Sequence, residues 1–279
     1  MNKVIIVAEV GQNHNGSLET ALKMVEAAKA CDVDAVKFQR RYPSIAVPEY
    51  MKQQSKETPW GTMSYLEYRN RLELPLSAYG VIDSACKRIG LPWFSSVWDL
   101  PSLEDMKRFD MPYIKIPSAC LTDHELIMAA KATGKPVILS TGMSTMSEIR
   151  QAAGLLNRSD VLCHCNSTYP CPNEALNLRC IATFKFLFRH LSIGYSGHEV
   201  GLAPTLAAVA LGAVYVERHF TLDRSMWGTD QAASVEPGGF RRLVKDIRVI
   251  EQALGDGDKR VTPGELEAMR KLRRVNSSA

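Results

Sequence analysis

The sequence has no long apolar run. No stretch of about 18 uninterrupted apolar residues, the length that a membrane-spanning helix needs, occurs in its 279 residues. Residues 1–9 also lack the long apolar core and the small-residue cleavage site of a secretory signal peptide. These absences argue against a membrane protein and against an exported one. We therefore expect a cytoplasmic protein with no membrane partner.

The sequence also has no large excess of positive or negative charge, since its net charge is only +4. Part of the basic excess lies near the carboxyl end, at residues 259–274, where a solvated helix face explains it. A nucleic-acid-binding surface needs a concentrated basic patch, so no nucleic-acid partner is expected. The modest positive charge still suits a small anionic substrate.

The seven cysteines form no disulfide framework, because their number is odd and their spacing is irregular in so long a chain. Reduced thiols in the cytosol are therefore expected. The segment Cys163-His164-Cys165 invites a zinc interpretation, since alternation along a strand points both thiols the same way. No second cysteine pair completes such a site, and packing within a strand is favoured.

A glycine-rich phosphate-binding turn is missing after the first predicted strand, which argues against a doubly wound dinucleotide-binding sheet. Short β-branched runs instead alternate with helical patterns along the chain. The strand candidates lie at 4–8, 35–38, 93–95, 113–116, 137–140, 161–164, 191–195 and 214–217. Eight strand–helix units in a chain of this length predict a single (β/α)8 TIM barrel.

Helix signals separate these strands. Residues 18–28 show the apolar spacing of an amphipathic helix, and the Ala- and Leu-rich run 202–213 predicts a buried one. Thr122 and Thr145 are each followed three residues later by a glutamate, a pattern that predicts a capping box at a helix start.

Two segments do not fit the regular alternation. The connection 40–75 is too long for an ordinary turn and is rich in aromatic residues, so we expect a lid or a subunit contact at the catalytic face. A last barrel helix is expected at 237–254, followed by a flexible turn and a short charged helix at 263–275. The predicted organisation is a catalytic barrel at 1–254 and a linker-like helical tail at 255–279.

Polar side chains gather at the carboxyl ends of the predicted strands, where the active sites of TIM barrels lie. Two of them are histidines: His198 follows one strand and His219 ends the next. Two imidazoles at neighbouring strand ends predict a two-nitrogen metal site with open positions for substrate and water. A hydrogen-bonding role for each histidine is the alternative.

Two lysines, Lys37 and Lys115, interrupt otherwise apolar strand segments. A buried ammonium group is costly without a counter-ion, so each lysine is expected to meet either a bound anion or an internal acid such as Glu9. Two lysines with several hydroxyls make a clamp for phosphate or carboxylate. The hydroxyl and amide side chains at the other strand ends are Gln39, Ser95, Ser96, Ser118, Ser140, Thr141, Asn166, Ser167, Tyr169 and Ser196.

Six segments together resemble the sialic acid synthases, which are the phosphoenolpyruvate-dependent N-acetylneuraminate synthases and their legionaminate and pseudaminate relatives. The segments are AEVGQNHNG at 8–16, VKFQ at 36–39, IKIPS at 114–118, HCNSTYP at 164–170, GYSGH at 194–198 and ERHFT at 217–221. The resemblance spans residues 4–254 in order. Any one segment alone is a weak signal, whereas six in register at strand ends are specific.

The resemblance implies a condensation of phosphoenolpyruvate with an open-chain aldose, giving a 3-deoxy-2-keto sugar acid and phosphate. It implies a divalent metal ion on His198 and His219, typically manganese, with magnesium or cobalt as alternatives, and it implies a homodimer. Glu9 and Lys115 would take part in catalysis with the two histidines. Phosphoenolpyruvate would be held by Lys37, Ser96, Lys115, Ser118, Ser167 and Ser196, and the metal or the sugar would be met by Glu9, Gln39, Tyr169 and Asp230.

Two departures from the family pattern bear on the acceptor sugar. The family usually has a sugar-contacting glutamate at the position of Cys120, whose thiol carries no carboxylate charge. The family also usually appends a small antifreeze-like domain, and we expect this protein to lack it. The acceptor is therefore expected to be N-acetylmannosamine or a related aldose, with a separate cap protein as one way to replace the missing domain.

Two other functions stay open at the level of the sequence. A Schiff-base pyruvate aldolase would use Lys115 as its nucleophile and would need no metal. A non-catalytic barrel subunit that binds a sugar or a phosphate would explain Cys120 and the missing cap.

Overall fold

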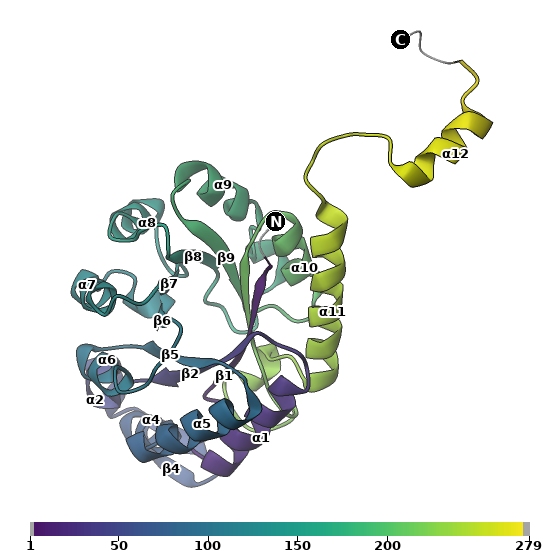
Figure 1. The fold of residues 1–279 in the computed structure, drawn as a ribbon. Coiled ribbons are helices and arrows are strands. Elements are labelled where there is room, and N and C mark those ends of the chain that lie inside the picture. The colour runs from purple at the N-terminus through teal and green to yellow at the C-terminus, as the bar shows by residue number, and fades with distance from the viewer. Residues whose placement is uncertain (1–2, 276–279) are drawn as a thin grey trace.

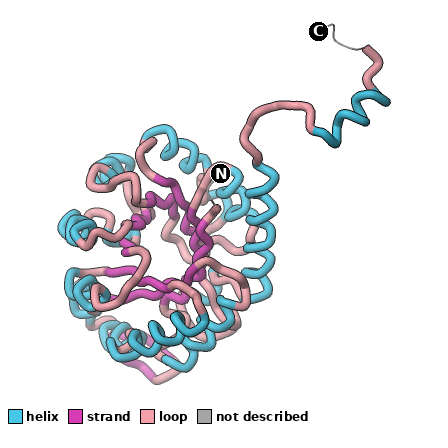
Figure 2. The backbone as a smooth tube through the Cα atoms, viewed as in Figure 1, coloured by secondary structure: helices cyan, strands magenta, loops and turns pink. Residues whose placement is uncertain are grey.

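The computed structural model describes residues 3–275, and their central feature is a closed barrel of eight parallel strands (Figure 1). Neighbouring strands follow the order β1-β10-β9-β8-β7-β6-β5-β2, so β1 pairs with both β2 and β10 and closes the ring. Figure 2 shows the strands as an inner ring with helices around them. The predicted (β/α)8 TIM barrel is confirmed.

The barrel strands begin close to their predicted starts, but several run further at the carboxyl end. The first, predicted at 4–8, continues to Gly11, and the last, predicted at 214–217, continues to His219. The prediction followed apolar residues, whereas backbone pairing carries the ladder on through polar residues that face the barrel interior. The strands are β1 (Ile5–Gly11), β2 (Ala35–Arg40), β5 (Trp93–Val97), β6 (Ile114–Ile116), β7 (Val137–Ser140), β8 (Val161–Cys165), β9 (Ser192–Gly197) and β10 (Tyr215–His219).

Helices surround the barrel and bury their apolar faces against it. In α1, Ser17 caps the first turn by accepting a hydrogen bond from the backbone N–H of Thr20, and Ala21, Val25 and Ala28 face the core. The helices around the barrel are α1 (Leu18–Lys29), α5 (Leu76–Ile89), α6 (Leu100–Met106), α7 (His124–Ala132), α8 (Met146–Ala153), α9 (Arg179–Leu187), α10 (Ala203–Ala210) and α11 (Pro237–Leu254).

One of the two predicted capping boxes is confirmed. Thr145 and Glu148 exchange both hydrogen bonds at the start of α8. The other is wrong, because α7 begins later than expected and is capped by Asp123, which accepts from the N–H of Leu126, rather than by Thr122. An aspartate directly after the threonine offers the stronger acceptor, and the helix starts there.

The long connection after β2 contains secondary structure of its own. It comprises α2 (Pro43–Ala46), α3 (Glu49–Lys52), an antiparallel hairpin of β3 (Ser55–Thr58) and β4 (Gly61–Ser64), and α4 (Tyr65–Leu72). Its aromatic residues reach the loop after β10, since the rings of Trp60 and Tyr68 lie 5.4 and 5.6 Å from Trp227. The connection therefore packs on the carboxyl-terminal face of the barrel. Its function as a lid or a subunit contact stays a prediction.

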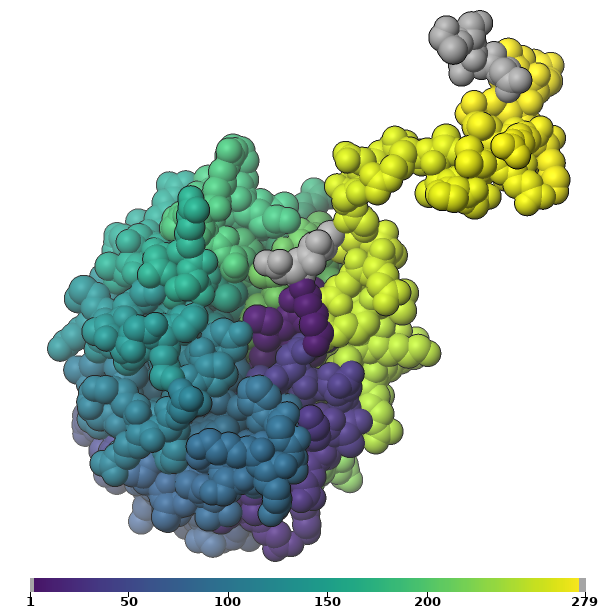
Figure 3. All heavy atoms as spheres, in the orientation of Figure 1, coloured from purple at the N-terminus to yellow at the C-terminus, as the bar shows by residue number. Residues whose placement is uncertain are grey.

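The segment after α11 stands away from the barrel. It holds one helix, α12 (Pro263–Leu272), three residues shorter than predicted, and no described residue of this helix is buried. Figure 1 and Figure 3 show α12 apart from the strands and their helices. The boundary between a barrel at 1–254 and a tail at 255–279 stays a prediction. Among residues 3–275, no helix combines the length and the apolar character that crossing a membrane requires.

Candidate functional site

A cavity of about 180 Å³ opens at the carboxyl ends of the barrel strands. Of the twelve predicted site residues, only Asp230 does not line it; Asp230 lies directly beside it, with a carboxylate oxygen 3.8 Å from Nδ1 of His219. The residues that do line it are Glu9, Lys37, Gln39, Ser96, Lys115, Ser118, Ser167, Tyr169, Ser196, His198 and His219.

Strand register brings these side chains to one level. Glu9 is the direct neighbour of His219 on one side and of Lys37 on the other. The same register continues around the barrel, where Ser96 pairs with Gln39 and with Lys115. Because side chains alternate along each strand, residues that pair in this way point together into the barrel.

Charged side chains at the floor of the cavity form a continuous ladder. Lys37 Nζ lies 2.7 Å from Glu9 and 3.4 Å from Glu217. Glu217 also meets Lys115 at 3.4 Å, and Lys115 donates a hydrogen bond of 2.6 Å to Ser140 Oγ. Both lysines therefore have an internal acid, as the alternative reading of the sequence expected. These four charged residues are all buried.

Glu217 was missed as a site residue, although it lies in the segment ERHFT. It precedes His219 by two positions on β10, so alternation places both side chains on the inner face. Its carboxylate also accepts a 2.6 Å hydrogen bond from the hydroxyl of Tyr215. An acid two residues before a candidate ligand on the same strand was the available signal.

The two acids of the ladder differ in their protonation. Burial raises the pKa of Glu9 to about 7, although Lys37 partly opposes this. Burial alone would also raise the pKa of Glu217, but Lys115 and Lys37 hold it far below its ordinary value. Near neutral pH two lysines thus face one ionised carboxylate and one that is partly protonated. The floor of the cavity keeps an excess of positive charge that suits an anion.

The rings of His198 and His219 lie 5.4 Å apart between their centroids. Two imidazole nitrogens on one ion, at ~2.1 Å and near a tetrahedral angle, place the ring centroids roughly 5.3 Å apart. His198 Nδ1 hydrogen-bonds to the carbonyl of Asn166 at 2.6 Å, which leaves its other nitrogen available. His219 Nδ1 is buried and has no hydrogen-bond partner among the described residues. The pair fits a shared divalent ion.

Protonation of the two histidines differs as well. Burial lowers the pKa of His219 to about 4, which keeps this imidazole neutral as a ligand must be. Burial would also lower the pKa of His198, but the Cys165 sulfur, 3.8 Å from its Nδ1, raises it above its ordinary value. A proton therefore competes with an ion for His198. Within residues 3–275, no group of three or more His, Cys, Asp and Glu side chains forms a metal cage.

A hydroxyl cradle lies beside the lysines. Ser118 Oγ accepts a 3.0 Å hydrogen bond from the backbone N–H of Gly142. A Cβ atom on Gly142 would stand 2.2 Å from Ser167 Oγ and 2.8 Å from Ser118 Oγ, so the backbone here approaches both hydroxyls as closely as a glycine allows. Ser96 Oγ, also in the cavity, is buried without a hydrogen-bond partner among the described residues. Such hydroxyl donors are suited to phosphate oxygens.

Comparison of this chain with known protein families identifies the family to which it belongs. The model of the NeuB family matches residues 24–259, most of the chain. The chain belongs to the NeuB family. The family and the type of enzyme expected from the sequence, a sialic acid synthase-like transferase, are therefore confirmed.

Relatives of this NeuB-family chain include enzymes with different products. The N-acetylneuraminate-9-phosphate synthase of Homo sapiens is 35% identical over 272 residues, covering 96% of this chain and 76% of that protein. The N,N'-diacetyllegionaminic acid synthase of Campylobacter jejuni is 35% identical over 277 residues, covering 95% and 81%. The crystal structure of the N-acetylneuraminic acid (sialic acid) synthetase from Leptospira borgpetersenii serovar Hardjo-bovis, in complex with citrate, superposes with a TM-score of 0.86 at 31% identity and covers 98% of this chain and 94% of that chain.

The NeuB-family site is supported from behind by residues that the sequence did not mark. Gln39 donates a 2.8 Å hydrogen bond to Glu9, and its side-chain Oε1 accepts one from Arg41. Arg41 is buried, pairs with Glu73 at 2.8 Å and lies over the ring of Trp98. The long connection, which ends near Glu73, is thereby linked to the carboxylate of Glu9.

Cys120, at the position of the family glutamate, does not line the cavity. It is buried, and its thiol lies 3.5 Å from the carbonyl of Trp98. Cys163 and Cys165 are free buried thiols on β8, and His164 between them points away and bonds to the carbonyl of Leu176. The segment packs within β8, whose five residues are all buried.

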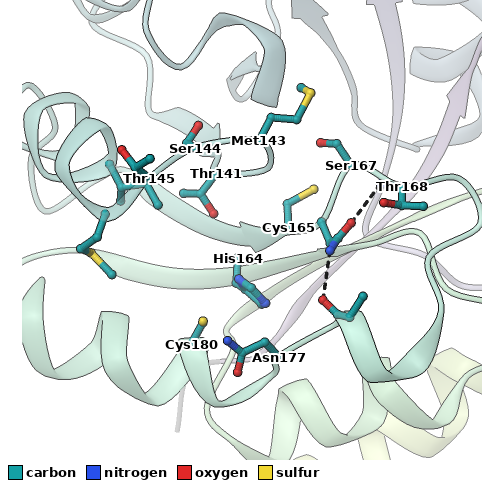
Figure 4. Close-up of a pocket in the computed structure, with 14 residues that line it drawn as sticks. Thr141, Met143, Ser144, Thr145, His164, Cys165, Ser167, Thr168, Asn177 and Cys180 are labelled. Atoms are coloured by element: carbon teal, nitrogen blue, oxygen red, sulfur yellow. Dashed lines mark hydrogen bonds between the residues drawn. The ribbon is translucent and has the colours of Figure 1, made fainter.

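A second cavity of about 650 Å³ adjoins the first in this NeuB-family chain. The two share Met143, Cys165 and Ser167. Its other walls carry hydroxyls and amides from the loop after β7 and from the segment after β8 (Figure 4), and no lysine, arginine, aspartate or glutamate lines it. The hydroxyl cradle is thus reached from a wide, uncharged side chamber.

Proposed function

We propose that this protein condenses phosphoenolpyruvate with an open-chain aldose, N-acetylmannosamine or a related sugar, to give a 3-deoxy-2-keto sugar acid and phosphate. The observation that carries the proposal is the buried ladder of Lys37, Glu217 and Lys115 beneath a hydroxyl cradle and beside two histidines. The names of the relatives support the same class of reaction.

Phosphoenolpyruvate carries a phosphate and a carboxylate, and the cavity offers partners for both. Lys37 and Lys115 would neutralise the anion, because the floor holds more positive than negative charge near neutral pH. The hydroxyls that would hold its oxygens are Ser96, Ser118, Ser167 and Ser196.

His198 and His219 would hold a divalent ion, with manganese as our first choice and magnesium or cobalt as alternatives. Such an ion supplies Lewis-acid polarisation of the sugar aldehyde when it is bound. Tyr169, whose ring lies 3.9 Å from that of His198, would cover this side of the cavity. Gln39 and Asp230 would meet the sugar or the ion from the side of His219.

The reaction balances with one water molecule. Carbon 3 of phosphoenolpyruvate bonds to the aldehyde carbon, the water oxygen bonds to carbon 2, and the bond between carbon 2 and the phosphate oxygen breaks. Glu9, held by Lys37 and Gln39, would orient that water and take its proton, while the aldehyde oxygen ends as a protonated hydroxyl. Lys37 and Lys115 would stabilise the leaving phosphate.

The test is an aldose panel with phosphoenolpyruvate and Mn²⁺, read by phosphate release and by product mass. We expect release that requires both an aldose and the ion, and a product heavier than the aldose by the mass of one pyruvic acid. Full activity after exhaustive chelation, or release that ignores every aldose, would contradict the proposal.

The Schiff-base alternative needs a neutral amine at Lys115. Burial would lower the pKa of this lysine, but the carboxylate of Glu217 raises it above its ordinary value, which disfavours a nucleophilic amine. Borohydride treatment with pyruvate is therefore expected to leave Lys115 unmodified. A homodimer, a cytoplasmic location and a separate cap protein stay predictions.

A further inference from the structure

A buried ion pair lies on the outer side of the barrel, directly behind the two histidines. Glu199 follows His198 in the chain, and Arg218 precedes His219. The guanidinium Nη1 of Arg218 lies 2.7 Å from Glu199 Oε1, and the side chains are 1% and 0% exposed. Each partner is thus one peptide bond from a candidate ligand, with its side chain on the opposite face of the strand end.

The pair holds the loop after β9 against β10 and α10. Arg218 Nη1 donates to the carbonyl of Gly201 at 2.9 Å and to Thr205 Oγ1 on α10 at 2.8 Å, and Nη2 donates to the carbonyl of Glu199. Glu199 in turn accepts 2.8 Å hydrogen bonds from the hydroxyls of Tyr195 and Thr205. Strand β9, strand β10, the loop and the helix meet at this one pair.

The backbone around His198 is held from both sides. A Cβ atom on Gly197 would lie 2.4 Å from Glu199 Oε2, so the carboxylate is packed directly under the residue before the histidine. On the other side, the N–H of Cys171 donates to the carbonyl of His198 at 2.9 Å, and Asn166 holds the ring nitrogen. The loop has little freedom to move His198 unless the ion pair changes.

Stability alone does not explain this pair. Burying two charges costs free energy that apolar side chains of similar volume would not incur. Arg218 Nε is in addition buried without a hydrogen-bond partner among the described residues. These costs are explained if the ion pair serves to fix the position of the backbone beside the two histidines.

We propose that Glu199 and Arg218 are positioning residues that set the separation of His198 and His219, and through it the affinity of the two-histidine site for a divalent ion. The inference rests on the ion site of the proposed function. Residues that orient ligands from behind typically change metal affinity by about 10- to 100-fold when they are replaced.

The experiment measures Mn²⁺ binding to the full-length protein without substrates, by the electron paramagnetic resonance signal of the free ion, together with thermal unfolding by circular dichroism. The main variant is Glu199→Met with Arg218→Met, which removes both charges at similar volume. Its matched control is Arg40→Met with Asp105→Met. These two residues form another buried ion pair, 2.7 Å apart. Arg40 follows the candidate site residue Gln39 in the chain, and neither partner adjoins a histidine.

We expect the Glu199/Arg218 double variant to unfold cooperatively and to bind Mn²⁺ about 10- to 100-fold more weakly, while the control keeps its affinity within about twofold. Unchanged affinity in the folded double variant would overturn the positioning role alone. No Mn²⁺ binding in the unaltered protein would instead overturn the ion site of the proposed function. If the double variant does not fold, Thr205→Val replaces it, and an affinity unchanged within about twofold would overturn the role.

Discussion

The two ends of the barrel use charged side chains in different ways. At the amino end, Asp34 accepts hydrogen bonds from the N–H of Ile6 and from Arg248, and it pairs with Lys3. Asp160 likewise accepts from the N–H groups of Val137 and Asn157 and pairs with Lys131 at 2.5 Å. Both oxygens of each carboxylate are engaged, and these groups fasten strand starts to neighbouring elements.

At the carboxyl end the polar side chains are less completely satisfied. Lys37 and Lys115 share Glu217 at 3.4 Å, while Lys37 lies closer to Glu9, at 2.7 Å, and Lys115 donates to Ser140 Oγ at 2.6 Å. Ser96 Oγ and His219 Nδ1 are buried without hydrogen-bond partners among residues 3–275. Since an unpaired buried polar atom costs free energy, this end carries a cost that a bound ligand would remove. The comparison separates charges that fasten the fold from a cluster of polar groups that the fold leaves partly unsatisfied.

The largest contrast is expected between two lysines, one at each end. Lys115→Met should lower kcat/KM for phosphoenolpyruvate by roughly 10³-fold, because it removes a charge in the cavity that would face the leaving phosphate in the proposed reaction. Lys131→Met should leave kcat/KM within about twofold and reduce the free energy of unfolding by roughly 1 to 2 kcal/mol, because Asp160 keeps its two backbone donors. Steady-state kinetics and urea unfolding measure the two effects, and equal losses of activity would break the comparison.

The next effect is a dependence of stability on pH at His14, a buried residue near the carboxyl end. Burial and the charge of Arg41 lower its pKa from 6.5 to about 4. The unfolded chain therefore takes up a proton at a higher pH than the folded protein does. The resulting stability is fully present above pH 6.5 and is lost as the pH falls towards 4, by about 3 kcal/mol in total.

Replacing His14 by Asn removes that titration and keeps an acceptor for the N–H of Gly16, which His14 Nδ1 now bonds at 3.0 Å. Urea unfolding between pH 7.5 and 4 should show the steeper loss in the unaltered protein. Parallel curves for the two proteins would mean that His14 does not titrate differently in the folded state.

The smallest effect concerns space rather than charge. Gly142→Ala should raise the KM for phosphoenolpyruvate by roughly 10- to 30-fold, about 2 kcal/mol, because its methyl group would enter the cradle of Ser118 and Ser167. Gly80→Ala is the control, since nothing lies within 4 Å of a Cβ atom at that helical position. Steady-state kinetics on both variants measure this KM. An unchanged KM for Gly142→Ala would show that the cradle does not bind phosphoenolpyruvate.

Much of the architecture was predictable because its signals are local. The runs at 137–140 and 161–164 became β7 and β8 almost unchanged, and Thr145 caps α8 as its pattern indicated. Thr122 failed because the sequence offers Asp123 beside it, and the choice between them depends on where the helix starts against its neighbours. The hairpin within 40–75 was missed, since its short polar strands lack the alternation that marks a strand.

The residues of the candidate site likewise fall into those that the sequence indicated and those that it did not. The lysines, serines and histidines were recognisable from residue type and from their place at strand ends. Arg41 and Glu73 were not, because their contact with Gln39 depends on how the long connection folds back.

The order of strands and helices, and the polar residue types at each strand end, follow from the sequence by itself, since hydrophobic periodicity is a property of neighbouring residues. Only the tertiary structure decided which of these residues meet. Lys115 and Glu217 stand 102 positions apart, and closure of the barrel and the register of its strands bring them together. The pairing of β9 with β10 likewise set the 5.4 Å between the ring centroids of His198 and His219, because that distance depends on the register of two neighbouring strands.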